Sequence, residues 1–351
     1  MPFKRPRRHG GAAAQPGLQC RSGFGRGGAL GVIVRWGLSQ LSELLREVGI
    51  VRPFLIAGER WSKLDLPASG RWSEVPSDRI DEIAAATGDA DGLLAVGGGS
   101  AIDLAKAVSV ASGLPVVSVP TTYSGSEWTP SFGIRDPQRR MQGGGAGAML
   151  AGIVYDPELT LTLPREESVG TAMNALAHCA EALYVKGRNQ EADALALEGA
   201  RTINEALPQV AAFLDDRKAR TRLLAGADAA GHALALAGLG LGHAMAQAIG
   251  GRYGLPHGAL NAICLPAALR FNEPVAGAEI ARFGEALKTE DPVARVRELA
   301  QLGGFVRLRD LGVPAEDLPA LAEAASVRGG AKANPRPATP AEIEGLLREI
   351  F

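Results

Sequence analysis

The chain has 351 residues, of which 46% are hydrophobic and 21% are charged, and its formal net charge is −1. A chain this close to neutrality has no bulk field that would draw it to nucleic acid or to an acidic membrane. It has no apolar run of about 18 residues and no signal-peptide core, which predicts no membrane span and, by default, residence in the cytoplasm. Its length suits two domains, and its three widely spaced cysteines match no disulfide framework.

Residues 1–28 are basic, with six lysine or arginine residues and no acidic residue. One interpretation is an arm that binds nucleic acid or a membrane. The interpretation that we favour is a disordered or loosely attached leader, because such a polar terminus buries too little apolar surface to fold. We therefore expect neither nucleic acid nor a membrane as a partner.

Residues 29–163 alternate between short β-rich runs and helical stretches. Strands are predicted at GVIVRW, PFLIAG, DGLLAVG and LPVVSVPTT, and helices at LSQLSELLREVG, SDRIDEIAAATG and AIDLAKAVSVASG. Strands separated by single helices indicate a parallel sheet with crossover helices. The sequence therefore predicts a Rossmann-like α/β domain over residues 29–163.

The pattern changes at Pro164, after which strand signals nearly vanish. Helical runs follow at ESVGTAMNALAHCAEALYVK, ADALALEGARTINEALPQVAAFL, ARTRLLAGADAAGHALALAGLG, HAMAQAIGGRYG, ALNAICLPAALRFN, AEIARFGEALK and PAEIEGLLREI. A proline at the change of composition marks the boundary. The sequence therefore predicts an all-α second domain over residues 164–351.

A glycine-rich turn joins a buried strand to a helix in LLAVGGGSAIDLAKA. Glycines let a backbone approach a pyrophosphate closely, and a helix start offers free N–H groups and a positive dipole end. The next strand ends in TTYSGSE, whose hydroxyl groups suit ribose and phosphate oxygens. Each loop alone could be an ordinary turn, but two on successive strands favour a phosphate-bearing cofactor at the carboxyl edge of the sheet.

Three histidines and one asparagine recur at spacings that suggest a shared site. Asn174 and His178 stand four residues apart in MNALAHCAEALY, so a helix places both on one face. His243 and His257 lie on either side of a glycine turn in GHAMAQAIGGRYGLPHG. This set is nearly a metal site, with an amide where a carboxylate would be expected.

The chain resembles the iron-containing alcohol dehydrogenase superfamily, and within it the maleylacetate reductase branch, in six motifs: VGGGSAIDLAKAVS, VPTTYSGSEWT, VYDPELTLTLP, MNALAHCAEALY, GGRYGLPHGALNAICLPAALRFN and ANPRPATPAEIEGLLREIF. The resemblance implies the dehydroquinate synthase-like architecture. In this arrangement an N-terminal α/β domain binds NADH or NADPH, and a C-terminal α-helical domain supplies the substrate and metal groups. The resemblance also implies a homodimer.

The resemblance assigns the two loops to the cofactor. It places Gly98, Gly99 and Ser100 at the pyrophosphate, Thr121, Thr122 and Ser126 at the nicotinamide ribose, and Asp103, Leu159 and Arg140 elsewhere along the nucleotide. The lysine that the family has after the SGSE loop is either replaced here by Arg140 or absent. Residues 135–152 depart most from the family pattern. The choice between NADH and NADPH stays open, because Glu59 favours a ribose diol and Arg60 favours a 2′-phosphate.

The resemblance also matches Asn174, His178, His243 and His257 to the aspartate and three histidines that hold a divalent ion in iron-dependent members. Asparagine removes the only anionic ligand, and a neutral amide oxygen replaces it poorly on a hard ion. Three histidines can still bind zinc. A divalent metal at these four residues is therefore the alternative to the metal-free site that we expect.

Two residues near the histidines bear on the substrate. Arg252 lies between His243 and His257 in the sequence and is a candidate clamp for a carboxylate; the alternative is a solvated turn residue. Gln247 stands where many family members have a histidine, and a glutamine orients a substrate but cannot relay a proton.

The function that we expect from the resemblance is NAD(P)H-dependent reduction of the maleylacetate reductase type. Hydride would add to the activated double bond of an enone dicarboxylate and give a 3-oxoadipate-like product, with imidazoles as hydrogen-bond or proton donors. One alternative is a metal-dependent alcohol or aldehyde oxidoreductase, in which Fe²⁺ or Zn²⁺ polarises a carbonyl. Another is a non-redox biosynthetic or binding relative that keeps the fold. The partner expected is a small carboxylate or carbonyl compound.

Overall fold

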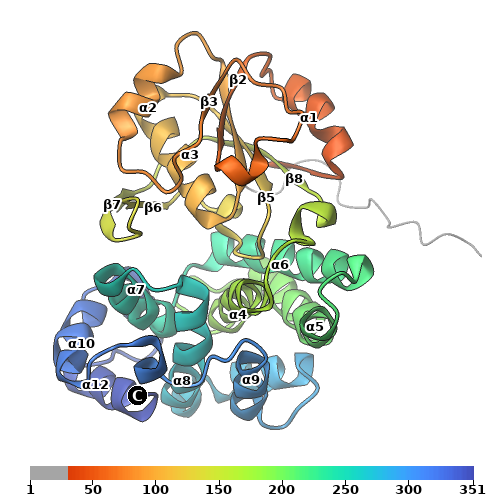
Figure 1. The fold of residues 1–351 in the computed structure, drawn as a ribbon. Coiled ribbons are helices and arrows are strands. Elements are labelled where there is room, and N and C mark those ends of the chain that lie inside the picture. The colour runs from red at the N-terminus through yellow and green to blue at the C-terminus, as the bar shows by residue number, and fades with distance from the viewer. Residues whose placement is uncertain (1–30) are drawn as a thin grey trace, which may run out of the picture.

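The computed structural model describes residues 31–351, so the basic leader predicted at residues 1–28 lies outside the described residues. The chain forms two stacked parts, and Figure 1 shows a sheet with its helices above a body of helices. The sheet part ends with β8 (Leu150–Tyr155) and η4 (Pro157–Thr160), and the first helix of the second part, α4, is Arg165–Ala182. The predicted boundary between residues 163 and 164 falls between η4 and α4, and the division into two domains stays a prediction.

Six parallel strands form the sheet in the order β1-β8-β5-β4-β2-β3. The strands are β1 (Ile33–Trp36), β2 (Pro53–Ala57), β3 (Gly70–Trp72), β4 (Gly92–Gly97), β5 (Val116–Pro120) and β8, and their connections contain η1 (Leu38–Gln40), α1 (Leu41–Glu47), η2 (Glu59–Trp61), α2 (Ile80–Ala86) and α3 (Gly99–Ser112). Gly97 pairs with Pro120, so the carboxyl ends of β4 and β5 lie side by side. The predicted α/β class is confirmed, and the two loops assigned to the cofactor leave neighbouring strands at one edge.

Helices cover both faces of the sheet because side chains alternate along each strand. Leu94 and Val96 of β4 pack with α1 on one face. Leu93 and Ala95 of the same strand pack with α2 and α3 on the other face. This two-sided burial explains why β4 has an uninterrupted apolar sequence.

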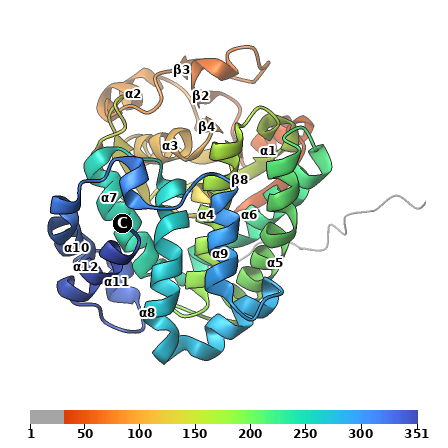
Figure 2. The ribbon, with the colours of Figure 1, turned by 60° about the horizontal axis from the view of Figure 1, so that its bottom comes forward.

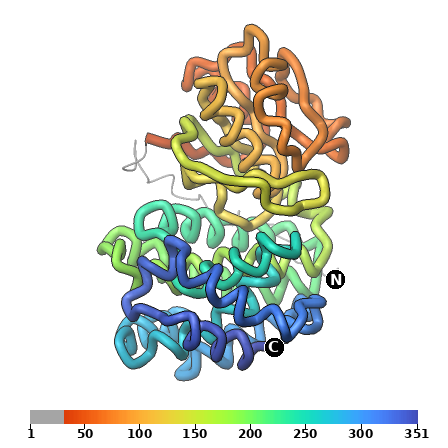
Figure 3. The backbone as a smooth tube through the Cα atoms, turned by 90° about the vertical axis from the view of Figure 1, so that its left-hand side faces the viewer, coloured from red at the N-terminus to blue at the C-terminus, as the bar shows by residue number. Residues whose placement is uncertain are grey.

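A short antiparallel hairpin of β6 (Phe132–Arg135) and β7 (Met141–Gly145) projects from the chain between β5 and β8, after η3 (Ser126–Trp128). Figure 3 shows this yellow segment crossing between the two parts. Gly254, directly after α7 (Leu241–Tyr253), approaches the hairpin turn, and a Cβ on it would lie 3.4 Å from the carbonyl oxygen of Gln138. The hairpin, which the sequence did not predict, therefore touches the helical part of the chain.

The helical part is built around α4, which packs against α5, α6 and α8 and is seen from below in Figure 2. Its other elements are α5 (Gln190–Ala212), α6 (Arg217–Ala237), α7, α8 (His257–Ala286), α9 (Pro292–Gln301), η5 (Leu308–Leu311), η6 (Ala315–Asp317), α10 (Leu318–Ser326), α11 (Gly329–Ala333) and α12 (Pro340–Glu349). The helices predicted at residues 259–272 and 278–288 form one helix, α8. It bends at Ala276, two residues after Pro274, because proline cannot continue the hydrogen-bond ladder.

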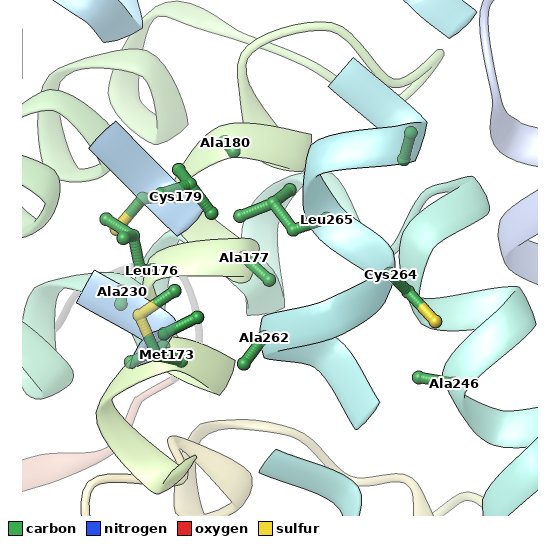
Figure 4. Close-up of a cluster of buried hydrophobic side chains, with 14 of the residues drawn as sticks. Met173, Leu176, Ala177, Cys179, Ala180, Ala230, Ala246, Ala262, Cys264 and Leu265 are labelled. Carbon is green, nitrogen blue, oxygen red and sulfur yellow. The ribbon is translucent and has the colours of Figure 1, made fainter. Parts of the chain in front are cut away.

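Small side chains let α4 and α8 lie close together. In Figure 4, Ala177 and Cys179 of α4 and Ala262 and Leu265 of α8 belong to one buried cluster. Short side chains at such a contact bring two helix backbones near each other and fix the relative positions of the side chains that they carry. The rigid α4–α8 pair positions Asn174, His178 and His257 for the site described below.

No single helix among the described residues is both long enough and apolar enough to cross a membrane. Helices α6 and α7 meet that test only as a pair, across a bend of 100°.

Candidate active site

A cavity of about 1050 Å³ lies between the carboxyl edge of the sheet and helices α4, α7 and α8. The loops after β4 and β5 form its sheet side, and the histidines lie on its helical side. Most of the predicted site residues line it: Gly98, Gly99, Ser100, Asp103, Thr121, Thr122, Ser126, Asn174, His178, His243, Gln247 and His257. The structure thus brings the cofactor motifs and the histidine motifs to one cavity, and the role of each residue stays a prediction.

The turn at Gly98 has no room for a side chain. A Cβ there would lie 2.8 Å from the methyl carbon of Thr122, so the loop after β4 touches the loop after β5. No side chain caps the start of α3. The hydroxyl groups of Thr122 and Ser124 are buried without a hydrogen-bond partner among the described residues. Uncapped N–H groups and free hydroxyls around one cavity fit the pyrophosphate and ribose of a dinucleotide.

A buried lysine joins Asp103 to Ser126. The Lys106 ammonium lies 2.8 Å from Asp103 Oδ1 and donates to Ser126 Oγ at 2.8 Å and to the carbonyl oxygen of Ser131 at 2.6 Å. Ser126 Oγ in turn donates to Asp103 at 2.6 Å. Asp103 and Ser126 therefore hold the loop after β5 against α3, in addition to lining the cavity.

A buried carboxylate orients His243. Glu181 and His243 are almost completely buried, and the His243 Nδ1–H donates to Glu181 Oε2 at 2.7 Å. Glu181 also accepts the backbone N–H groups of Gly240 and His243. A Cβ on Gly240 or Gly242 would lie 2.9 Å from this carboxyl group, so only glycines leave room for it. The ring nitrogen left for a ligand is Nε2, which is buried without a partner among the described residues.

The three imidazoles lie against one another. The ring centroids of His178 and His243 are 4.7 Å apart, and those of His243 and His257 are 5.7 Å apart. Burial lowers the pKa of His178 well below its ordinary value, and the other two imidazoles add to this effect. Burial, followed by the charges of His243, Arg135 and Arg328, lowers the pKa of His257 to about 3. His178 and His257 are therefore neutral near pH 7.

Asn174 is held by hydrogen bonds at both ends of its amide. Its Nδ2 donates to the carbonyl oxygen of Ser124 at 2.8 Å, and its Oδ1 accepts from Asn261 Nδ2 at 2.6 Å. Asn261 Nδ2 also lies 3.0 Å from His257 Nε2, and Asn174 Nδ2 lies 3.4 Å from His178 Nε2. Two amides hydrogen-bonded to each other thus lie beside the Nε2 atoms of His178 and His257.

This donor set does not fit a divalent ion. Asn174 Oδ1 and the Nε2 atoms of His178 and His257 each face an amide N–H group, and no carboxylate offsets the charge that an ion would bring. Across residues 31–351, no three His, Cys, Asp or Glu side chains are arranged to hold a metal ion.

Three predicted site residues do not line the cavity. Arg140 lies exposed by the hairpin, and its Nε donates to Asp136 at 2.8 Å. Arg252 pairs with Asp317 at 2.7 Å, which leaves it poorly placed as a substrate clamp. Leu159 is buried in the apolar cluster on the α1 face of the sheet. The two arginines are thus paired with carboxylates of the protein, and Leu159 packs against other apolar side chains.

Four residues of the site were not predicted. Glu181 and Asn261 orient histidines, and Arg135 and Arg328 line the cavity. A signal for Glu181 was available, because a charged residue in the apolar run AHCAEALY requires a buried partner. Asn261 follows His257 at the same four-residue spacing that separates Asn174 from His178. The sequence does not mark the two arginines, since only the tertiary fold brings both to the wall of one cavity.

Comparisons with known proteins agree with this geometry. Residues 33–154 match the iron-containing alcohol dehydrogenase family, and residues 168–351 match the C-terminal part of the Fe-containing alcohol dehydrogenase family. The chain belongs to the iron-containing alcohol dehydrogenase family. The predicted family and fold are thereby confirmed, and the chain is an oxidoreductase by this membership.

Two relatives within this family carry the same name. A maleylacetate reductase from Burkholderia cepacia is 38% identical over 263 residues, which cover 75% of this chain and 74% of that protein. A maleylacetate reductase from Rhizobium sp. (strain MTP-10005) is 33% identical over 347 residues, covering 93% and 94%. A crystal structure of maleylacetate reductase from that strain matches with a TM-score of 0.81 at 31% identity, covering 91% of this chain and 96% of the other.

Proposed function

We propose that the chain reduces maleylacetate, or a closely related enone dicarboxylate, with NADH or NADPH and without a resident metal ion. The observation that carries this proposal is the hydrogen-bonded pair Asn174 and Asn261, whose amide N–H groups face three of the atoms that would otherwise be available to a metal. The names of the relatives support the substrate. Residence in the cytoplasm and a homodimer stay predictions.

The cofactor would be held at the sheet side of the cavity. Gly98, Gly99 and Ser100 present the uncapped start of α3, and Thr122 and Ser124 present free hydroxyls. When bound, a reduced nicotinamide supplies the hydride. Of the two residues that left the choice of nucleotide open, Arg60 lines the cavity, where its Nη2 donates to Thr162 at 2.8 Å, and Glu59 does not line it.

The helical side would stabilise the charge that develops in the substrate. Hydride addition to the alkene carbon remote from the ketone moves the double-bond electrons onto the ketone oxygen as an enolate. His243 is placed to hold that oxygen when its ring carries a second proton, because Nε2–H would then donate to the oxygen while Nδ1–H donates to Glu181, whose negative charge offsets the charge of the ring. A proton from water or from the imidazole then completes the carbon next to the ketone.

The test is whether the purified chain reduces maleylacetate with NADH and with NADPH. The reaction would be monitored through the loss of absorbance of the reduced nicotinamide. We expect turnover that survives treatment with a chelator, and metal far below one ion per chain by elemental analysis. Activity that is lost on chelation and restored by Fe²⁺ or Zn²⁺ would favour the metal-dependent alcohol or aldehyde oxidoreductase. Failure to bind either nucleotide in calorimetry would favour a non-redox relative.

A further inference from the structure

Two arginines reach the cavity from opposite parts of the chain. Arg135 ends β6 of the hairpin, and Arg328 directly precedes α11 of the helical part. Both line the cavity, and both are partly buried. A cavity that places two guanidinium groups beside its reaction centre has a strong preference for anionic ligands.

Neither arginine has an acidic partner. No carboxylate lies within 4.0 Å of either guanidinium among residues 31–351, and residues 1–30 contain no aspartate or glutamate. The acidic residues on the cavity wall are Asp103, Glu166 and Glu167. Asp103 is paired with Lys106, and neither glutamate forms an ion pair with an arginine of residues 31–351. The two positive charges are thus left for a ligand.

The hydrogen-bond capacity of the two groups is also largely unused. Among the described residues, the Arg135 guanidinium makes one hydrogen bond, from Nη1 to the carbonyl oxygen of Arg139 at 2.9 Å. The Arg328 guanidinium makes none within the same part of the chain, and its Nε is buried without a partner. Both side chains are partly buried. This burial lowers the pKa of both guanidinium groups, and the charge of Asp103 partly opposes the effect at Arg135. Partly dehydrated N–H donors with no acceptor are costly unless a ligand supplies one.

The anion site borders the imidazoles. Arg135, Arg328 and His257 line the same cavity. A Cβ on Gly251 would lie 3.6 Å from Arg328 Nη2 and 3.8 Å from Met141 Cβ, so Arg328 lies beside the hairpin that carries Arg135. The charges of both arginines act on His257, whose ring lies 5.7 Å from that of His243. We propose that Arg135 and Arg328 bind a carboxylate of the substrate and hold its ketone at His243. This inference rests on the proposed function, and it replaces Arg252, whose guanidinium is already paired with Asp317.

A carboxylate bound by both arginines would connect the hairpin with the helical part. Because the arginines recognise negative charge, the site would select substrates that carry a carboxylate. Neutral enones lack the group that the arginines recognise and would bind weakly. The other source of an anion in this cavity is a phosphate of the nucleotide. Arg60 of η2 lines the sheet side of the cavity, whereas Arg135 and Arg328 come from the hairpin and from the helical part that carries His257. This placement favours the substrate over the nucleotide.

The test compares Arg135→Gln and Arg328→Gln with a matched control, Arg297→Gln. Arg297 is exposed on α9, forms no ion pair and does not line the cavity. For each variant we would measure kcat and KM with maleylacetate, the Kd of the nucleotide, and the Kd of 3-oxoadipate, the expected product. Circular dichroism and thermal unfolding would verify that each variant folds.

We expect KM for maleylacetate and Kd for 3-oxoadipate to rise about 10- to 100-fold in each cavity variant, as for loss of a charge-assisted hydrogen bond. The nucleotide Kd and the control variant should be unchanged. Equal KM values in all variants would overturn the inference, as would a loss confined to nucleotide binding. If 3-oxoadipate binds through the arginines but maleylacetate is not reduced, the anion site stands and the proposed function fails.

Discussion

At the scale of single residues, Asn174 is informative because one atom of its amide donates a hydrogen bond and the other accepts one. Its Nδ2 donates to the carbonyl oxygen of Ser124, and its Oδ1 accepts from Asn261. A carboxylate can perform only the second task. An aspartate here would place a negative oxygen against a carbonyl oxygen, and it would supply the anionic ligand that the histidines lack.

The substitution Asn174→Asp should therefore strengthen the binding of Zn²⁺ or Fe²⁺ without raising the rate of reduction. Without metal, we expect the free energy of unfolding to fall by about 1–3 kcal/mol, because the Ser124 carbonyl loses its donor. Elemental analysis, thermal unfolding with and without metal, and kcat with maleylacetate would measure these effects.

The control is Asn272→Asp, which alters another buried amide pair, Asn272 with Asn334, away from the histidines. It should lose stability without gaining metal affinity. Metal binding that is equally weak in Asn174→Asp and in the natural chain would contradict the argument.

At the scale of elements, the sequence predicted those whose side chains form long apolar patterns. Strands β1, β2, β4 and β5 and helices α3 to α7 lie where expected. The hairpin strand β7 was missed because MQGGG is exposed along its whole length and has no apolar alternation. Strand β8 was missed because a glycine, Gly152, interrupts the apolar run LAGIVY. The fold requires glycine at this position, since a Cβ there would lie 2.9 Å from the Leu44 side chain.

The site residues were also predicted only where a local sequence pattern places them. Spacing along a helix placed Asn174 with His178, because an interval of four residues has a fixed geometry. No local rule connects Glu181 to Gly240, which meet only when the helices pack. None brings Arg135 and Arg328 to one cavity either, since they are distant in the sequence. The resemblance likewise supplied Arg140 and Leu159, but not the partners that hold them outside the cavity lining.

A buried acidic network joins η3, β8 and α6. Tyr155 donates to Glu127 at 2.7 Å, and Trp128 Nε1 lies 3.0 Å from both the Tyr155 hydroxyl and Asp228. Burial raises the pKa of Glu127 to about 7 and that of Asp228 to about 6, while a backbone N–H, the Tyr155 hydroxyl and, less strongly, the charge of Lys106 oppose the effect at Glu127. Both carboxyl groups therefore take up protons more readily in the folded chain than in the unfolded chain.

Stability should fall as pH rises through this range. A carboxyl group whose pKa is higher in the folded chain stabilises the fold while it is protonated. For Glu127 this contribution is complete below the pKa of the unfolded chain, near 4.5, and it is lost as the pH rises through the folded pKa of about 7. At about 1.4 kcal/mol per pH unit, Glu127 accounts for at most roughly 3 kcal/mol between pH 4.5 and pH 7. Denaturant unfolding at several pH values would measure the slope.

Glu127→Gln should flatten that slope, because the amide stays neutral and still accepts from Tyr155. The remaining slope would come from Asp228. The control is Glu43→Gln, an exposed residue of α1, which should keep the slope of the natural chain. An unchanged slope in Glu127→Gln would show that this carboxyl group does not control the pH dependence.

At the scale of the whole molecule, the cavity takes its walls from both parts, which meet through close glycine contacts. A Cβ on Gly231 of α6 would lie 2.6 Å from the Trp128 ring and 3.0 Å from Gly125 Cα, in the loop after β5. Such contacts leave no space for independent movement of the loop and the helix. A ligand that fills the cavity should therefore stabilise the chain as a unit.

Nucleotide binding should accordingly raise the unfolding temperature of the whole chain in one transition. At 100 times Kd, a bound nucleotide adds about 2.7 kcal/mol to the free energy of unfolding. In Gly98→Ala the new methyl group would press on Thr122 and close the turn to a pyrophosphate, so the shift should vanish. Gly345→Ala, on α12 with open space around it, should keep the full shift. Differential scanning calorimetry with NADH and with NADPH measures both variants. A shift of equal size in Gly98→Ala would mean that the nucleotide binds without this turn, since the added methyl group would otherwise exclude its phosphates.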